Sequence, residues 1–326
     1  MKVTDVSFGN TLLPQIILGH LPFIGESYQG RSKNQMYLER FSDVNEIVKI
    51  VLRAMEYGID VLSAPSPSDG KVAQRYFKAI DKVRDSLNVK LRMIPCIGLP
   101  IVLDGKPIHV YRRWLTYLHF EKKLADELEE RYINDPILQC RENWVEDFPR
   151  ALQNLKPYSD RECERLEIDF KTFDDILLQI RDYDLIFVEL GSETDFLSMV
   201  GRIDLIGELI EHVERICNVK TLLGIHHAGV SIPILDDSGL DFVGYLTPIN
   251  PLGVMMFPTP DLAIKAIKNA KKPIIAIKPF AGGRVKPKDA FQYIFNDIGV
   301  NVCMIGVASI EELDEDIRII QQIFKI

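Results

Sequence analysis

The sequence predicts one α/β domain over residues 1–326, a (β/α)8 or TIM barrel with an N-terminal β-hairpin and an insertion after the third strand. Two observations predict this fold. Eight short apolar runs are separated by helical stretches, an order that requires parallel strands joined by right-handed crossovers. The length of 326 residues also suits a barrel that carries one insertion.

The eight apolar runs are rich in Ile, Val and Leu, as is typical of strands buried on both faces. They are predicted to end near residues 19, 63, 97, 189, 226, 246, 278 and 306. Helices are predicted at residues 44–57, 71–86, 203–217, 260–270 and 288–296, and from Ser309 onward. Because the last helix opens with SIEE, we expect a capping box between Ser309 and Glu312.

The segment KVTDVSFGNTLLP (residues 2–14) precedes the first barrel strand. Its Gly9 and Asn10 indicate a tight turn between two antiparallel strands. We expect this hairpin to close the N-terminal end of the barrel.

Residues 100–170 form a segment far longer than an ordinary connection. The segment contains Trp114, Trp144 and a charged stretch, residues 121–133, that is predicted to be helical. Because it follows the third strand, it leaves the barrel at the end where ligands bind. We interpret it as a helical lid, or as the contact through which a homo-oligomer forms. A passive surface elaboration is the alternative.

The composition is that of an ordinary globular protein, with 47% hydrophobic and 26% charged residues. A net charge of −8 and a pI near 5.4 argue against a nucleic-acid partner. No apolar run approaches the roughly 18 residues of a membrane span, and the N-terminus lacks a signal peptide's apolar core. A cytoplasmic protein without a membrane partner is therefore expected. The five cysteines are scattered and give no metal-site signature.

Polar and titratable residues stand where the predicted strands end. The end of the barrel at which the strands finish should present His20, Ser63, Cys96, Glu189, His226 or His227, Asn250 and Lys278. Buried ionisable groups are costly unless paired, so such a cluster indicates a site. We take His20, Glu189, His226, His227 and Lys278 as the candidate catalytic residues.

These candidates also have structural interpretations. His226 and His227 are adjacent, so only one of them can point into the barrel. Glu189 could form a salt bridge with Lys278 across the barrel mouth. Cys96 is interpreted as a small core residue, because no activating base can be placed beside it.

The stretch PIIAIKPFAGGRV (residues 273–285) predicts an anion site after the seventh strand. Lys278 and Arg284 would supply positive charge there, and the amides of Gly282 and Gly283 could approach a phosphate closely. The eighth strand adds Gly306 and the start of the helix at Ser309. We assign the binding of a cofactor or phosphate group to Asn250, Lys278, Gly282, Gly283, Arg284, Gly306 and Ser309.

Several of these motifs are similar to those of the aldo-keto reductases. ILGHLPFIG (17–25), GIDVLSAPSPSDG (58–70) and TPINPLG (247–253) resemble family segments at strands one, two and six. KPFAGGRV and GVASIEELDEDI resemble its signatures at strands seven and eight, which are the most specific. The resemblance covers all strands except the third and excludes the 100–170 insertion. It implies the same barrel.

The reductase tetrad of Asp, Tyr, Lys and His does not carry over. The matching positions hold Ser63, the tyrosine-free segment 68–69, Cys96 and Glu189. Ordinary carbonyl reduction by a tyrosine acid is therefore not expected.

The cofactor motifs have changed as well. The resemblance places His226 and His227 where the family holds the nicotinamide carboxamide, and Ile277 where a tyrosine stacks on the ring. After the eighth strand, acidic residues replace the basic residue that binds a 2′-phosphate in the family. NADP or NAD remains open as a cofactor, but the standard binding mode is not expected.

Four functions stay open from the sequence. The first is a barrel that binds a small phosphate-bearing or nucleotide-type molecule at its mouth, as an oxidoreductase with an altered active site. The second is a metal-dependent hydrolase or lyase that uses His20, Glu189 and His226 or His227. In the third, Lys278 forms a Schiff base. The fourth is a non-catalytic binding protein.

Overall fold

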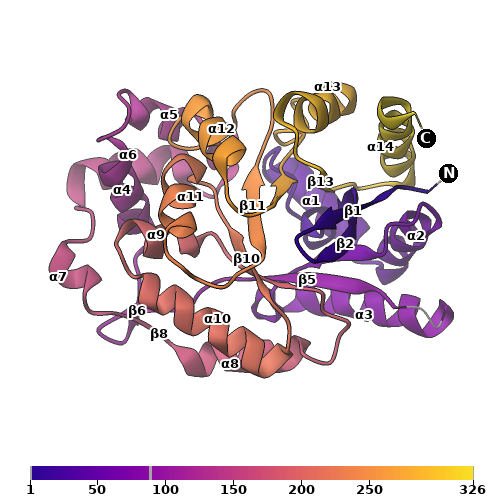
Figure 1. The fold of residues 1–326 in the computed structure, drawn as a ribbon, viewed down its shortest axis with the longest axis horizontal. Coiled ribbons are helices and arrows are strands. Elements are labelled where there is room, and N and C mark those ends of the chain that lie inside the picture. Colours follow the sequence, from indigo (N-terminus) through magenta and orange to yellow (C-terminus); the bar gives the residue numbers. More distant parts are fainter. Residues whose placement is uncertain (1, 88–89, 326) are drawn as a thin grey trace.

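The computed structural model describes residues 2–87 and 90–325 and confirms the (β/α)8 barrel (Figure 1). Eight parallel strands close into a ring in which the last strand pairs with the first. They are β3 (Ile16–Leu18), β4 (Val61–Ala64), β5 (Arg92–Ile97), β9 (Val188–Leu190), β10 (Thr221–Gly224), β11 (Gly244–Pro248), β12 (Ile274–Ile277) and β13 (Val302–Ile305). Every predicted strand is present, and each ends within two residues of its predicted position.

The predicted barrel helices are present too. They are α2 (Val44–Glu56), α3 (Lys71–Leu87), α10 (Ile203–Cys217), α12 (Pro260–Asn269), α13 (Pro287–Gln292), which continues as a π-helix over Tyr293–Ile298, and α14 (Ile310–Phe324). Outside the insertion, four further helices are present that the apolar pattern does not predict: α1 (Arg31–Arg40), α8 (Phe170–Ile180), α9 (Glu193–Met199) and α11 (Ala228–Asp236). The last of these contains Pro233, which is a breaker signal in sequence.

The predicted hairpin consists of β1 (Asp5–Phe8) and β2 (Thr11–Pro14), which pair antiparallel. Its inward residues belong to a core cluster inside the barrel: Phe8, Leu13, Ile17, Val61, Ile94, Phe187, Leu222, Leu246, Ile275 and Val302. Phe8 needs a glycine at position 244, because a Cβ there would lie 2.8 Å from its ring. The hairpin side chains therefore fill the barrel interior at the N-terminal end of its strands.

The insertion combines helices with a small sheet. Strands β6 (Ile101–Leu103), β7 (Lys106–Pro107) and β8 (Leu166–Ile168) form an antiparallel sheet at its base. Its helices are α4 (Val110–Glu121), α5 (Leu128–Asn134), α6 (Trp144–Asn154) and α7 (Asp160–Cys163). The prediction of one helix over 121–133 is wrong, because α4 ends at Glu121 and Glu127 adopts a left-handed conformation before α5.

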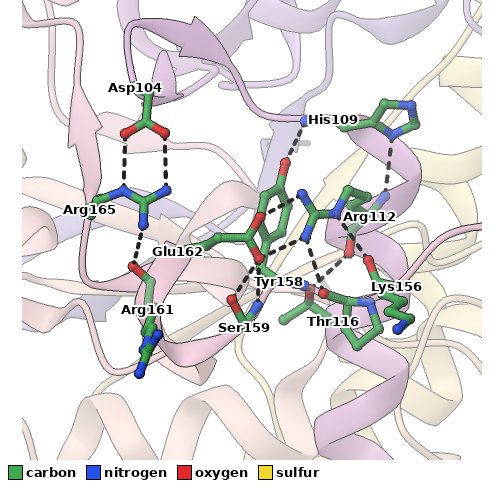
Figure 2. A network of polar contacts seen from close by, with 11 residues as sticks. Asp104, His109, Arg112, Thr116, Lys156, Tyr158, Ser159, Arg161, Glu162 and Arg165 are labelled. Carbon is green, nitrogen blue, oxygen red and sulfur yellow. Dashed lines mark hydrogen bonds and ion pairs between the residues drawn. The ribbon is translucent and has the colours of Figure 1, made fainter.

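Charged pairs hold the two ends of the insertion together (Figure 2). The guanidinium of Arg112 binds both carboxylate oxygens of Glu162, each at 2.9 Å. Arg165 binds Asp104 in the same bidentate way, at 3.0 Å. The Tyr158 hydroxyl accepts the backbone amide of His109 at 2.7 Å. Such forked contacts fix orientation as well as distance, so α4 is held firmly against the returning chain.

The insertion also docks on the loops at the C-terminal end of the barrel. Arg131 donates hydrogen bonds to the carbonyls of Gly253 and Met256, at 2.7 and 2.8 Å, in the loop after β11. The completely buried carboxylate of Glu121 accepts a hydrogen bond from Nδ1 of His227 at 2.7 Å, after β10, and another from the Tyr132 hydroxyl. The insertion thus braces loops that carry candidate site residues.

Within the described residues, none of the helices combines the length and apolar character needed to cross a membrane.

We predict that Phe8→Ala lowers the free energy of unfolding by about 3–5 kcal/mol, because it empties part of the barrel interior. Leu12→Ala on the same hairpin is the matched control, since Leu12 is 58% exposed and should change stability little. Urea denaturation measures both. Similar losses for the two variants would contradict the role of the hairpin as a barrel plug.

We predict that Glu121→Leu lowers the free energy of unfolding by about 3–5 kcal/mol, because it leaves His227 and Tyr132 without their buried acceptor. Glu142→Leu is the control: Glu142 pairs with Arg31 at the surface, where ion pairs stabilise little. Thermal and urea denaturation measure both variants. A stable Glu121→Leu protein would show that this contact does not hold the insertion.

Candidate functional site

A cavity of about 710 Å³ opens at the C-terminal ends of the barrel strands. The strand ends and the loops after β3, β12 and β13 supply most of its walls. Six of the polar residues expected at the mouth line this cavity: His20, Ser63, Cys96, Glu189, His226 and Lys278. Among the described residues, none of segment 100–170 lines this cavity, although Cys140 and Pro136 of the insertion contact Tyr28 and Arg284 of its walls.

Glu189, the middle residue of β9, places a carboxyl group at the barrel mouth. It is 8% exposed, and burial raises its pKa to about 7, although the charge of Lys278 and a hydrogen bond with Cys96 act in the opposite direction. Gly224 on the neighbouring strand makes room for it, since a Cβ there would lie 2.7 Å from Oε1 of Glu189. At neutral pH this carboxyl can therefore both give and accept a proton.

Lys278 is held at the end of β12 in a left-handed backbone conformation, with φ at +54°. Its Nζ lies 5.0 Å from the centre of the Tyr28 ring. Among the described residues no ion pair joins Lys278 to Glu189, so the salt bridge considered from the sequence is not formed. The ammonium instead remains available to a ligand in the cavity.

His20 is neutral in this setting. Burial and then the charge of Lys278 lower its pKa to about 3. Nδ1 of His20 forms a hydrogen bond with the Ser63 hydroxyl, and the Tyr76 hydroxyl donates one to the Ser63 carbonyl at 2.7 Å. The side chain is thus an oriented neutral group at the cavity wall.

The two adjacent histidines face different ways. His226 lines the cavity. Its pKa lies well below the usual value, first because of burial and then because of the positive charge of Lys278. His227 points to the insertion and binds Glu121 there. The buried carboxylate of Asp195, which sequence reasoning missed, fixes this turn by accepting both histidine amides, at 2.7 and 3.3 Å.

The loop after β12 presents backbone amides and uses its arginine internally. Gly282 and Gly283 have φ of +67° and +77° and line the cavity, and neither amide donates a hydrogen bond within the described chain. The guanidinium of Arg284 donates to the carbonyls of Ala281 and Tyr28, at 2.9 and 3.1 Å. Arg284 therefore shapes the loop, and it also lines the cavity with its positive charge.

Two residues assigned to cofactor binding lie outside the cavity lining. The side-chain amide of Asn250 exchanges two hydrogen bonds of 3.0 Å with the backbone of Val254, so it closes its own loop. The hydroxyl of Ser309 caps α14 by accepting the amide of Glu312 at 3.2 Å. Only this half of the predicted capping box is formed, because Glu312 accepts the amide of Ala308 instead, at 2.7 Å. Gly306 does line the cavity.

Three carboxyl groups of α14 form an edge of the cavity that sequence reasoning missed. They belong to Glu312, Glu315 and Asp316, which we call the acidic edge. Asp316 is only 3% exposed, and burial and then the two glutamates raise its pKa to about 8. The available signal is the acidic run SIEELDED (residues 309–316), which predicts a helix start but does not show that its carboxyl groups face the cavity.

A metal site does not emerge from the candidates. Over residues 2–87 and 90–325, no group of three or more His, Cys, Asp or Glu side chains is arranged to hold a metal ion. His227 is directed to the insertion, which removes one of the ligands considered from the sequence.

Comparison with known proteins supports the fold. No family model matches the sequence, and a search of curated proteins gives no match either. Two solved structures of a candidate aldo-keto reductase from Pseudomonas aeruginosa match with a TM-score of 0.54 at 14% identity, over 98% of this chain and 94% and 95% of theirs. The chain therefore has the barrel fold of the aldo-keto reductases, as its strand motifs predicted.

Proposed function

We propose that the barrel binds a small organic molecule in the mouth cavity and that Glu189 exchanges a proton with it. The observation that carries this proposal is the buried Glu189 carboxyl, whose pKa burial raises to about 7 in a cavity that Lys278 also lines. A group whose pKa lies near the working pH is the most effective general acid or base.

The opposite wall can hold negative charge. Lys278 and the free amides of Gly282 and Gly283 line the same cavity as Glu189. They can bind a carboxylate, a phosphate or the oxygen of a carbonyl group. When Glu189 removes a proton from the carbon next to a carbonyl, the electron pair moves to that oxygen, where this wall stabilises it. The reaction class is proton transfer at a carbonyl compound.

Nucleotide binding in the reductase manner has less support. The acidic edge lies on α14, directly after strand eight, and would repel a 2′-phosphate. NADP, with its 2′-phosphate, does not fit this edge, whereas the 2′-hydroxyl of NAD could donate a hydrogen bond to a carboxylate there. A phosphate-bearing ligand is compatible with the proposal only where its phosphate lies at Lys278 and the two glycines.

The other functions are distinguished by experiment. The metal-dependent alternative has no suitable ligand cluster among the described residues. A non-catalytic binding protein would bind the same ligands as an enzyme but would not exchange protons with them.

We predict that the protein catalyses solvent deuterium incorporation next to the carbonyl of at least one compound in a panel of aldehydes, ketones and 2-oxo acids. The assay is proton NMR in D2O. Glu189→Gln should lower the exchange rate about 10²- to 10⁴-fold, because it removes the base while keeping the shape. The surface variant Glu142→Gln should exchange like the wild type. Equal rates for Glu189→Gln and wild type, or no exchange across the panel, would contradict the proposal.

We predict a pH-dependent stability difference between the wild type and Glu189→Gln. The folded state raises the pKa of Glu189 from 4.5 to about 7, so it binds the proton more tightly than the unfolded chain does. The wild type should therefore lose up to about 3 kcal/mol relative to the variant as the pH rises through this window. Urea denaturation from about pH 4.5 to 8 measures the difference. Parallel curves would mean that the pKa of Glu189 is not raised.

A further inference from the structure

The mouth cavity has two edges of opposite chemical character. One edge consists of Lys278 and the free amides of Gly282 and Gly283. The other is the acidic edge on α14, beside which Tyr37 of α1 also lines the cavity. The function proposed above uses the first edge and leaves the second without a role.

Asp316 is the member of the acidic edge that most needs a partner. Its side chain is 3% exposed and lines the cavity, yet it accepts no hydrogen bond within the described part of the chain. Burial and then the charges of Glu312 and Glu315 raise its pKa to about 8. A buried carboxyl without donors is costly, so a donor supplied by a ligand would stabilise it.

The three carboxyl groups of the acidic edge indicate which chemical group of a ligand can bind there. A phosphate at this edge would be repelled by the negative charge of the three carboxyl groups. Within residues 2–87 and 90–325, no salt bridge joins any of the three to a lysine or arginine, and no metal-binding cluster includes them. An organic ammonium or guanidinium group brings both positive charge and several N–H donors. The neighbouring Tyr37 ring already has Nζ of Lys33 at 5.2 Å from its centre, so the carboxyl groups supply the recognition.

We propose that the ligand of this barrel carries an amino or guanidino group that binds Glu312, Glu315 and Asp316, while its carboxylate or carbonyl end lies at Lys278. This inference rests on the proposed function, which assigns the oxygen-bearing end, and it narrows the ligand class to amino carbonyl compounds and amino acids with a terminal cation. The two opposite edges orient such a molecule along the cavity.

The test is a binding series measured by isothermal titration calorimetry at low salt. Unbranched ω-amino acids of three to eight carbons are compared with the carboxylic acids and the primary amines of the same lengths. In the wild type, the best amino acid should bind at least about tenfold more tightly than its parent acid, as a charge-assisted hydrogen bond to a carboxylate allows.

Variants locate the effect on the acidic edge. Asp316→Asn should reduce the tenfold preference to about threefold or less, and the exposed Glu315→Gln should reduce it partly. Glu311→Gln is the matched control, because this residue lies on α14 without lining the cavity. Melting temperatures establish that each variant is folded. If Asp316→Asn does not fold, Glu315→Gln together with the salt dependence of the preference decides the matter.

The outcomes separate the two proposals. Equal binding of amino acids and parent acids by the wild type, or a preference that Asp316→Asn and Glu315→Gln leave unchanged, would overturn the cationic group and leave Lys278 as an acid-binding residue. If primary amines bind and depend on Asp316 while acids do not bind, the acidic edge is supported and the assigned role of Lys278 fails.

Discussion

The account depends on one physical constraint, the desolvation of a carboxyl group inside the closed barrel. Glu189 lies on a strand that is apolar on either side and has been removed from water, with Gly224 leaving the space that it occupies. Burial there favours the neutral acid, and the charge of Lys278 favours the anion. The balance between these opposing effects leaves the group able to change its protonation state near neutral pH.

The barrel could be predicted because each of its strands is a run of apolar residues that is recognisable in the sequence alone. An apolar run such as Ile274–Ile277 packs against helices on one face and against the barrel interior on the other. Its consecutive residues are therefore all apolar, which can be recognised in the sequence. Helix α11 was missed because packing overrides the proline within it. The break between α4 and α5 was missed because tertiary contacts override local propensity: Glu121 and Arg131, on either side of it, bind the barrel loops.

The candidate site was predictable where it follows strand ends and less so where it depends on tertiary contacts. His20, Glu189, His226 and Lys278 meet because parallel strands finish at one rim. The direction of His227 depends on a carboxylate more than one hundred residues away, which no local pattern reveals. Arg284 and Asn250 are engaged by backbone groups of loops whose shape the sequence does not specify, whereas Ser309 caps α14 as its sequence predicts. Asp316 faces the cavity only because α14 packs beside the mouth.

A direct measurement of the protonation state of Glu189 tests the central claim. Infrared difference spectroscopy can compare the wild type with Glu189→Gln across a pH series and isolate the carbonyl stretch of this one carboxylic acid. The account predicts a protonated band that disappears with a midpoint near pH 7, in line with the pKa of about 7. A carboxyl that is already ionised at pH 6, with a midpoint near its ordinary pKa of 4.5, would contradict it.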